Sequence, residues 1–183
     1  MSTLVGRDKT ALLVIDVQND VATGAYNLPS VLTNINIAID KARAAGVPVV
    51  WVQHNDDEMP VDTDGWQIVS ELQPAAGEPI VRKTFKSSFE ATNLEEILAG
   101  LNVSHLVITG MQTNNCIRHT THAALERGYD VTLVNDAHST TGYEWGGHEV
   151  TAKEVVDEAN DNFGGYELPG RGSRTEAASS LSF

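Results

Sequence analysis

Three side chains of different chemistry lie at the ends of apolar segments in this sequence. Asp16 interrupts the apolar run "ALLVIDV", Lys83 closes "PIVRK", and Cys116, the only cysteine, follows "HLVITG". A thiolate attacks electrophilic carbon, a carboxylate can take the thiol proton and pass it to a leaving group, and an ammonium stabilises the thiolate. Together, the three residue types indicate nucleophilic catalysis.

Each residue also has a purely structural interpretation. A free cysteine is often a small buried hydrophobe, and an aspartate at a strand end can bond the backbone amides of a loop. Lysines such as Lys83 and Lys86 are usually solvated surface charges. The case for catalysis therefore depends on whether the chain brings the three groups together.

The pattern of apolar residues predicts strands that alternate with helices. The expected strands are Ala11–Val17, Val47–His54, Pro79–Lys83, His105–Gly110 and Asp130–Ala137. Helices are expected over Ser30–Gly46, over the segment that starts at Thr92, from the region of Cys116 to Gly128, and over Thr151–Phe163. Thr92 and Thr151 each have a glutamate three residues later, which is the spacing of a capping box at a helix N-terminus. Such alternation predicts an α/β fold with a mostly parallel sheet.

Ligands of open parallel sheets bind beyond the carboxyl ends of the strands. Asp16, His54 and Lys83 all lie at such ends, and Cys116 follows the fourth strand. We therefore expect a carboxylate, an ammonium and a thiol on one rim. Because Cys116 is expected near a helix N-terminus, we also expect a lowered thiol pKa.

Composition narrows the class of protein. The 183 residues carry a net charge of −13, which argues against nucleic acid or an anionic membrane as partner. A single cysteine excludes an internal disulfide and a multi-cysteine metal site. No run approaches the ~20 apolar residues of a membrane span, so a cytoplasmic protein is expected.

One domain is expected over residues 1–167. It is followed by a polar, turn-rich tail over residues 168–183, which we expect a neighbouring subunit to order.

The order of the motifs resembles the isochorismatase-like cysteine hydrolases. The stretches "LLVIDVQND", "VRKTFKSSFEATNLEEIL" and "LVITGMQTNNCIRHTTHAALERGYDVTLVNDAHST" are similar to the aspartate, lysine and cysteine motifs of that family. The resemblance runs from about Ala11 to Asn160. It implies a Rossmann-like three-layer α/β/α sandwich with six parallel strands, and a homo-oligomer, either a dimer or a tetramer.

The resemblance also implies roles for individual residues. Asp16 would be the acid/base, Lys83, six residues before Phe89, the lysine, and Cys116 the nucleophile. A cis peptide would join Met111 to Gln112, and the amides of Gln112 and Cys116 would form the oxyanion hole. No cofactor is expected.

The sequence departs from the family pattern at three places. The first motif commonly ends in phenylalanine, where this chain has Val21. The metal-binding branch has several histidines after the second strand, whereas this chain offers His54 and no other before His105, so no metal is expected. The last strand of the family's sheet is hard to find after "NDNFGGYELPGR".

The function expected is a cysteine amidohydrolase that acts on C–N bonds of a small amide-type substrate through a Cys116 thioester. The substrate pocket is expected to involve Gln18, His54, Trp66 and Phe89. One alternative is an isochorismatase-type vinyl-ether hydrolase in which Asp16 protonates the substrate and Cys116 is a bystander. The other is a catalytically inactive oligomeric family member.

Overall fold

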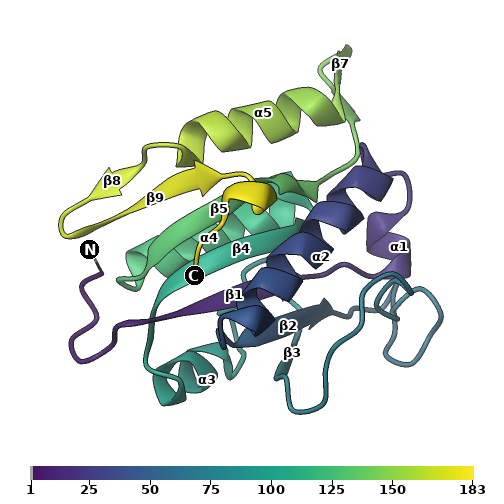
Figure 1. Cartoon of the computed structure of the whole chain (residues 1–183). Coiled ribbons are helices and arrows are strands. Elements are labelled where there is room, and N and C mark those ends of the chain that lie inside the picture. The colour runs from purple at the N-terminus through teal and green to yellow at the C-terminus, as the bar shows by residue number, and fades with distance from the viewer. Residues whose placement is uncertain (1) are drawn as a thin grey trace.

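A central parallel sheet organises the computed structural model, which describes residues 2–183 (Figure 1). The sheet has seven strands in the order β3-β2-β1-β4-β5-β9-β8. Six of them are parallel, as expected, and the short β8 pairs antiparallel with β9. The strands are β1 (Lys9–Ile15), β2 (Val49–His54), β3 (Ile80–Lys83), β4 (Val103–Met111), β5 (Asp130–Ser139), β8 (Glu167–Leu168) and β9 (Arg171–Glu176).

Helices cover both faces of this sheet and complete the expected three layers (Figure 1). The α-helices are α1 (Asn19–Ala22), α2 (Leu28–Ala44), α3 (Leu94–Gly100), α4 (Arg118–Glu126) and α5 (Ala152–Phe163). A π-helical turn, η1 (Thr113–Ile117), precedes α4, and a 3-10 turn, η2 (Ala178–Ser180), lies near the C-terminus. A hairpin of β6 (Tyr143–Trp145) and β7 (His148–Val150), which the sequence did not predict, precedes α5.

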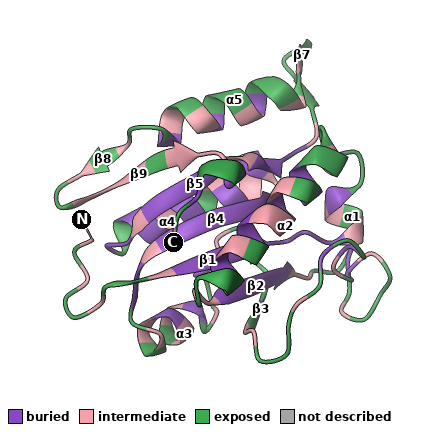
Figure 2. Ribbon diagram, viewed as in Figure 1, coloured by how far each residue is buried: buried purple, intermediate pink, exposed green. Residues whose placement is uncertain are grey.

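Two apolar cores lie between the sheet and its helices, and the central strands β1, β2, β4 and β5 are largely buried (Figure 2). In β1, Leu12 and Val14 belong to the core under α2, whereas Leu13 and Ile15 belong to the core on the other face. This alternation follows from the period of two along a strand. A strand buried on both faces is apolar throughout, which explains the continuous run in this segment.

The C-terminal segment packs on its own chain, so the expected boundary at residue 167 is wrong. Strand β9 pairs in parallel with β5 over Val131–Val134. Beyond it, Ala178 and Leu181 are buried in the core under α2, and Lys41 Nζ donates hydrogen bonds to the carbonyls of Ser179 and Leu181. Backbone pairing orders a segment whose polar side chains gave no strand pattern, and this order needs no neighbouring subunit.

The two expected capping boxes have different outcomes. Thr151 forms the box with Glu154 at the start of α5. Thr92 does not, because its hydroxyl donates to the Ser88 carbonyl and α3 starts at Leu94. Across residues 2–183, no helix combines the length and apolar character needed to cross a membrane.

Candidate active site

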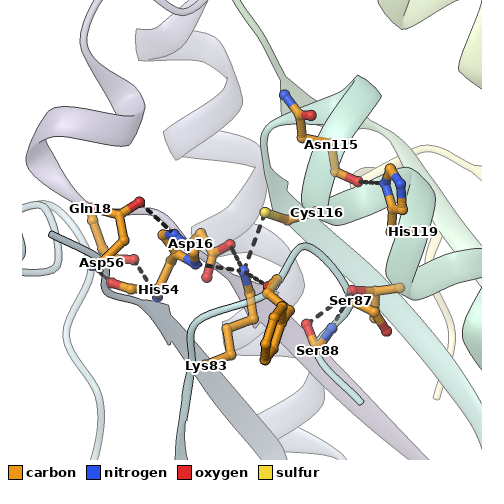
Figure 3. A network of polar contacts seen from close by, with 12 residues as sticks. Asp16, Gln18, His54, Asp56, Lys83, Ser87, Ser88, Asn115, Cys116 and His119 are labelled. Carbon is orange, nitrogen blue, oxygen red and sulfur yellow. Dashed lines mark hydrogen bonds and ion pairs between the residues drawn. The ribbon is translucent and has the colours of Figure 1, made fainter. Parts of the chain in front are cut away.

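The carboxyl ends of neighbouring strands bring together the three residues that the sequence singled out. Asp16 directly follows β1, Lys83 is the last residue of β3, and Cys116 lies in η1 after β4. Figure 3 shows Lys83 reaching toward both Asp16 and Cys116. The prediction that these groups meet on one rim of the sheet is confirmed.

Lys83 is the centre of this cluster. Its Nζ atom lies 2.7 Å from Asp16 Oδ2, and both side chains are fully buried. The same Nζ atom lies 3.2 Å from Cys116 Sγ. An ammonium between a carboxylate and a thiol can stabilise negative charge on either group while protons move between them.

The backbone at the end of β1 is shaped by a close approach of β4. Asp16 has a φ of 51°, and its amide donates to the Val52 carbonyl at 2.9 Å. Gly110 of β4 has a φ of 119°, and a Cβ atom there would lie 2.0 Å from the Ile15 carbonyl oxygen. Only glycine has room at this crossing, so Gly110 lets β4 pass directly beside the turn that carries Asp16.

Between β4 and the nucleophile candidate, the Met111–Gln112 peptide is cis, as the resemblance implied. The amides of Asn115 and Ile117 both donate to the Gln112 carbonyl. Cys116 therefore sits inside a π-helical turn, two residues before α4 begins at Arg118. Cys116 thus lies near the start of a helix, as expected, but the turn that holds it is π-helical rather than α-helical.

The protonation of Cys116 also differs from expectation, because its pKa is raised to about 12 rather than lowered. Burial is the main cause, and the Asp16 carboxylate adds to it, while the Lys83 ammonium opposes the shift. The sequence-based argument for the thiol pKa counted the helix terminus alone and left out the burial of the thiol and the effect of the neighbouring carboxylate. The thiol is therefore protonated at neutral pH.

Asp16 is perturbed in the same direction. Complete burial raises the pKa of its carboxyl group, and the charge of Lys83 and the hydrogen bonds from Cys116 and Lys83 oppose that shift. A carboxylate with a raised pKa is a stronger base than one in water. The site thus pairs a protonated thiol with an unusually basic carboxylate.

A cleft of about 420 Å³ opens onto these groups. It is lined by Asp16, Val21, His54, Asp56, Glu58, Lys86, Gln112, Asn115 and Cys116. The position where the family commonly has phenylalanine is thus a wall of the cleft, formed here by the smaller Val21. Of the four residues expected to bind substrate, only His54 lines this cleft.

Gln18 is buried and holds the loop after β2 instead of facing the cleft. Its side-chain amide donates to the carbonyls of His54 and Trp66, and its Oε1 accepts from the His54 amide at 2.8 Å. These bonds fasten the β1 end to the β2 end. The expected role in substrate binding is therefore corrected to a structural one.

Trp66 and Phe89 also lie elsewhere. Trp66 lines a separate cavity together with Arg82, whose guanidinium carbon is 5.3 Å from the indole ring centroid. Phe89 packs in the core with its ring 5.9 Å from that of Tyr129. Both were expected in the pocket because aromatic side chains often line ligand sites, but here they fill space under loops.

The sequence analysis missed several cleft residues. Asp56 follows the end of β2 by two positions, so the strand-end rule could have found it. Glu58 and Asn115 come from irregular or turn segments, whose course the sequence did not indicate. Lys86 was noted only as an alternative surface lysine near Lys83, and it lines the cleft. Within residues 2–183, no group of three or more histidine, cysteine, aspartate or glutamate side chains is arranged to hold a metal ion.

Comparison with known proteins agrees with this geometry. The model of the isochorismatase domain family matches residues 10–158, which span all three members of the cluster. The chain belongs to the isochorismatase family. The resemblance drawn from the three motifs is thereby confirmed.

Relatives in sequence and structure extend the comparison. A streptothricin hydrolase of Streptomyces noursei is 36% identical over 140 residues, 73% of this chain and 56% of the relative, so the chain spans about half of that protein. A crystal structure described as an isochorismatase hydrolase from Oleispira antarctica has a TM-score of 0.87 at 27% identity, covering 97% of this chain and 98% of the other. An N-carbamoylsarcosine amidase from Thermoplasma acidophilum has a TM-score of 0.76 at 26% identity, covering 96% and 100%.

Proposed function

We propose that this isochorismatase-family hydrolase is a cofactor-independent amidohydrolase. It would cleave a C–N bond of a small amide-type substrate through a thioester on Cys116. The observation that carries this proposal is the buried ion pair of Asp16 and Lys83, placed with its ammonium 3.2 Å from the only thiol of the chain.

In the first half-reaction, Asp16 accepts the Cys116 proton as the sulfur attacks the substrate carbonyl carbon. The raised pKa values of both groups fit this role, because the thiol keeps its proton until attack and the carboxylate is basic enough to take it. Lys83 stabilises the sulfur while it carries charge. The amides of Gln112 and Cys116 are the proposed donors to the oxyanion.

Collapse of the tetrahedral intermediate breaks the C–N bond. Asp16 returns the proton to the departing nitrogen, which leaves as an amine or ammonia, and the acyl group remains on sulfur. In the second half-reaction, Asp16 takes a proton from water, the resulting hydroxide displaces the thiolate, and the proton returns to Cys116. No redox partner or metal is needed for this balance of atoms and protons.

The relatives support C–N cleavage as the reaction class. The N-carbamoylsarcosine amidase is by name an amidase, and it matches this chain along its whole length. The streptothricin hydrolase is a hydrolase that shares 36% identity over the matched region.

A substrate screen tests the proposal. Small amides, carbamates and ureides are incubated with the wild type and with Cys116→Ala, and release of amine or ammonia is measured. We expect turnover of at least one class by the wild type, loss of that turnover in Cys116→Ala, and an acyl adduct on Cys116 in intact-protein mass spectra with a slow substrate. Full activity of Cys116→Ala would refute the nucleophile, and cleavage of isochorismate that survives Cys116→Ser would favour vinyl-ether hydrolysis by Asp16.

A further inference from the structure

A buried chain of hydrogen bonds ties the turn that carries Cys116 to the rest of the fold. The Oγ1 atom of Thr113, the first residue of η1, lies 2.9 Å from Nδ1 of His138 in β5. His138 Nε2 lies 3.0 Å from Asn160 Oδ1 in α5, and Asn160 Nδ2 donates to the Asn135 carbonyl. Thr113 and His138 are both buried. The chain therefore links the turn to a neighbouring strand and helix.

The Asn135 carbonyl decides the direction of each bond in this chain. A carbonyl oxygen only accepts, so Asn160 must turn its NH2 group toward it and its own oxygen toward His138. That oxygen also accepts, so the imidazole must carry a proton on Nε2. Complete burial lowers the pKa of His138, opposed by the Asn160 hydrogen bond and the charge of Asp136, so the ring is neutral at neutral pH. A neutral ring leaves Nδ1 as an acceptor, and the Thr113 hydroxyl donates to it.

A second hydrogen bond fastens the same turn to the same strand end. Thr140, which directly follows β5 and is buried, donates from its hydroxyl to Asn114 Oδ1 at 2.8 Å. His138 itself pairs in register with Gly110 of β4, so the strand that leads into η1 lies beside the strand that holds it. The two side-chain contacts hold successive residues at the start of η1, and Cys116 follows in the same turn.

We propose that His138 is a positioning residue for the Cys116 nucleophile, which it holds in place by accepting the Thr113 hydroxyl. This inference rests on the proposed role of Cys116. The position of the sulfur matters because the Lys83 ammonium lies 3.2 Å away and the Asp16 carboxylate lies beside that ammonium. A displacement of about 1 Å at a reacting atom is enough to lower a catalytic rate substantially.

Displacement of the turn would also change the protonation of the thiol. Burial and the Asp16 carboxylate raise the pKa of Cys116 to about 12, and Lys83 opposes this shift. Because the net effect of the surroundings is to raise the pKa, movement of the sulfur out of this position should lower it. Thr113→Val keeps the shape of the side chain and removes the hydroxyl, which leaves His138 Nδ1 buried without a donor. We expect the turn to loosen in response.

The test compares the alkylation of Cys116 by iodoacetamide in the wild type, Thr113→Val and Thr113→Ser between about pH 8 and about pH 11. The rate is read from intact mass, since a single cysteine makes the adduct unambiguous. Thr113→Val should react at least about threefold faster at about pH 9 and level off at a lower pH. A pKa one unit lower gives about tenfold more thiolate, which is individually a weaker nucleophile. Thr113→Ser keeps the hydroxyl and should behave as the wild type.

Thr132→Val is the matched control. The Thr132 hydroxyl oxygen lies 2.8 Å from His105 Nε2, so a buried threonine also contacts a histidine near the other end of β5. Its loss should destabilise the fold to a similar extent and leave the alkylation profile of Cys116 unchanged. Equal rates for Thr113→Val and Thr132→Val would overturn the proposal, and so would a Thr113→Ser variant that reacts as fast as Thr113→Val.

The tautomer of His138 provides a second measurement on the wild type, which applies even if Thr113→Val does not fold. Nitrogen NMR of the imidazole near neutral pH should show the proton on Nε2 and a lone pair on Nδ1. A proton on Nδ1 would reverse the bond to Thr113 and refute the proposed role. No substrate is used in either experiment, so the outcome is independent of whether C–N bonds are cleaved.

Discussion

The Nζ atom of Lys83 lies 2.7 Å from Asp16 Oδ2, and neither side chain is exposed to solvent. The free-energy cost of desolvating two buried charges offsets most of the Coulombic attraction between them. Such a pair therefore contributes little net stability compared with apolar residues of the same size. Removing one partner is different, because it leaves an uncompensated buried charge. The pair is thus better explained by the chemistry it can perform on Cys116 than by stability.

Lys83→Met should lower the free energy of unfolding by about 3–5 kcal/mol near neutral pH, because Asp16 is left buried and unpaired. The folded-state pKa of Asp16 is already raised, and loss of Lys83 removes the charge that opposes this shift. A group whose folded pKa lies above its unfolded pKa loses stability as pH rises, so the deficit should shrink as pH falls. Urea denaturation at about pH 7 and about pH 5 measures both effects.

The double variant Asp16→Asn/Lys83→Met is the control for this prediction. It removes both charges, so it should be more stable near neutral pH than Lys83→Met alone. If Lys83→Met loses the same unfolding free energy at both pH values, lost packing rather than the buried charge causes the destabilisation.

Gly110→Ala should prevent the close crossing of β4 and β1. The new Cβ would lie 2.0 Å from the Ile15 carbonyl oxygen, and alanine would have to adopt a φ of 119°. Overpacking and backbone strain together should cost about 3 kcal/mol or more and displace the turn that carries Asp16. Thermal and denaturant unfolding report the loss of stability. In contrast, Gly165→Ala should change little, since nothing lies within 4 Å of its Cβ position.

The positions of the central strands and their carboxyl ends were the part of this molecule that the sequence predicted well. Long apolar runs mark buried parallel strands, and their carboxyl ends lie along one edge of the sheet, which placed Asp16, Lys83 and Cys116 together. The protonation of Cys116 could not be predicted in the same way. Its pKa depends on burial and on the exact distance to an anion, and neither quantity follows from spacing along the chain.

Loops limited the prediction of the substrate cleft. Trp66 belongs to the long connection between β2 and β3, and its course is set by tertiary bonds such as those from Gln18 to the Trp66 carbonyl. Aromatic type alone cannot distinguish a cleft wall from a packed loop. For the same reason, β9 was missed, since "RGSRTE" has no apolar alternation and pairs through its backbone.

Leu181→Ala tests whether the C-terminal segment contributes to the stability of its own chain. Leu181 is 6% exposed and packs in the core under α2, so its truncation should cost about 2–3 kcal/mol. Ser182→Ala, at an exposed neighbouring position, should be close to neutral. Denaturant unfolding at two protein concentrations gives both values. A tail ordered by a partner would instead make the effect of Leu181→Ala depend on protein concentration.

His105 should make the fold sensitive to mild acid. Its ring lies between the Thr10 and Thr132 hydroxyls, and burial, with a smaller contribution from Arg174, lowers its pKa to about 4. The unfolded chain takes up this proton near pH 6.5, so stability is complete above that value and falls as pH decreases toward 4, by up to about 3 kcal/mol. His105→Gln can still reach Thr132 and cannot titrate. The difference in unfolding free energy between wild type and His105→Gln should therefore change by up to about 3 kcal/mol between about pH 7 and about pH 4. If this difference is the same at both pH values, the buried imidazole of His105 is not neutral as expected.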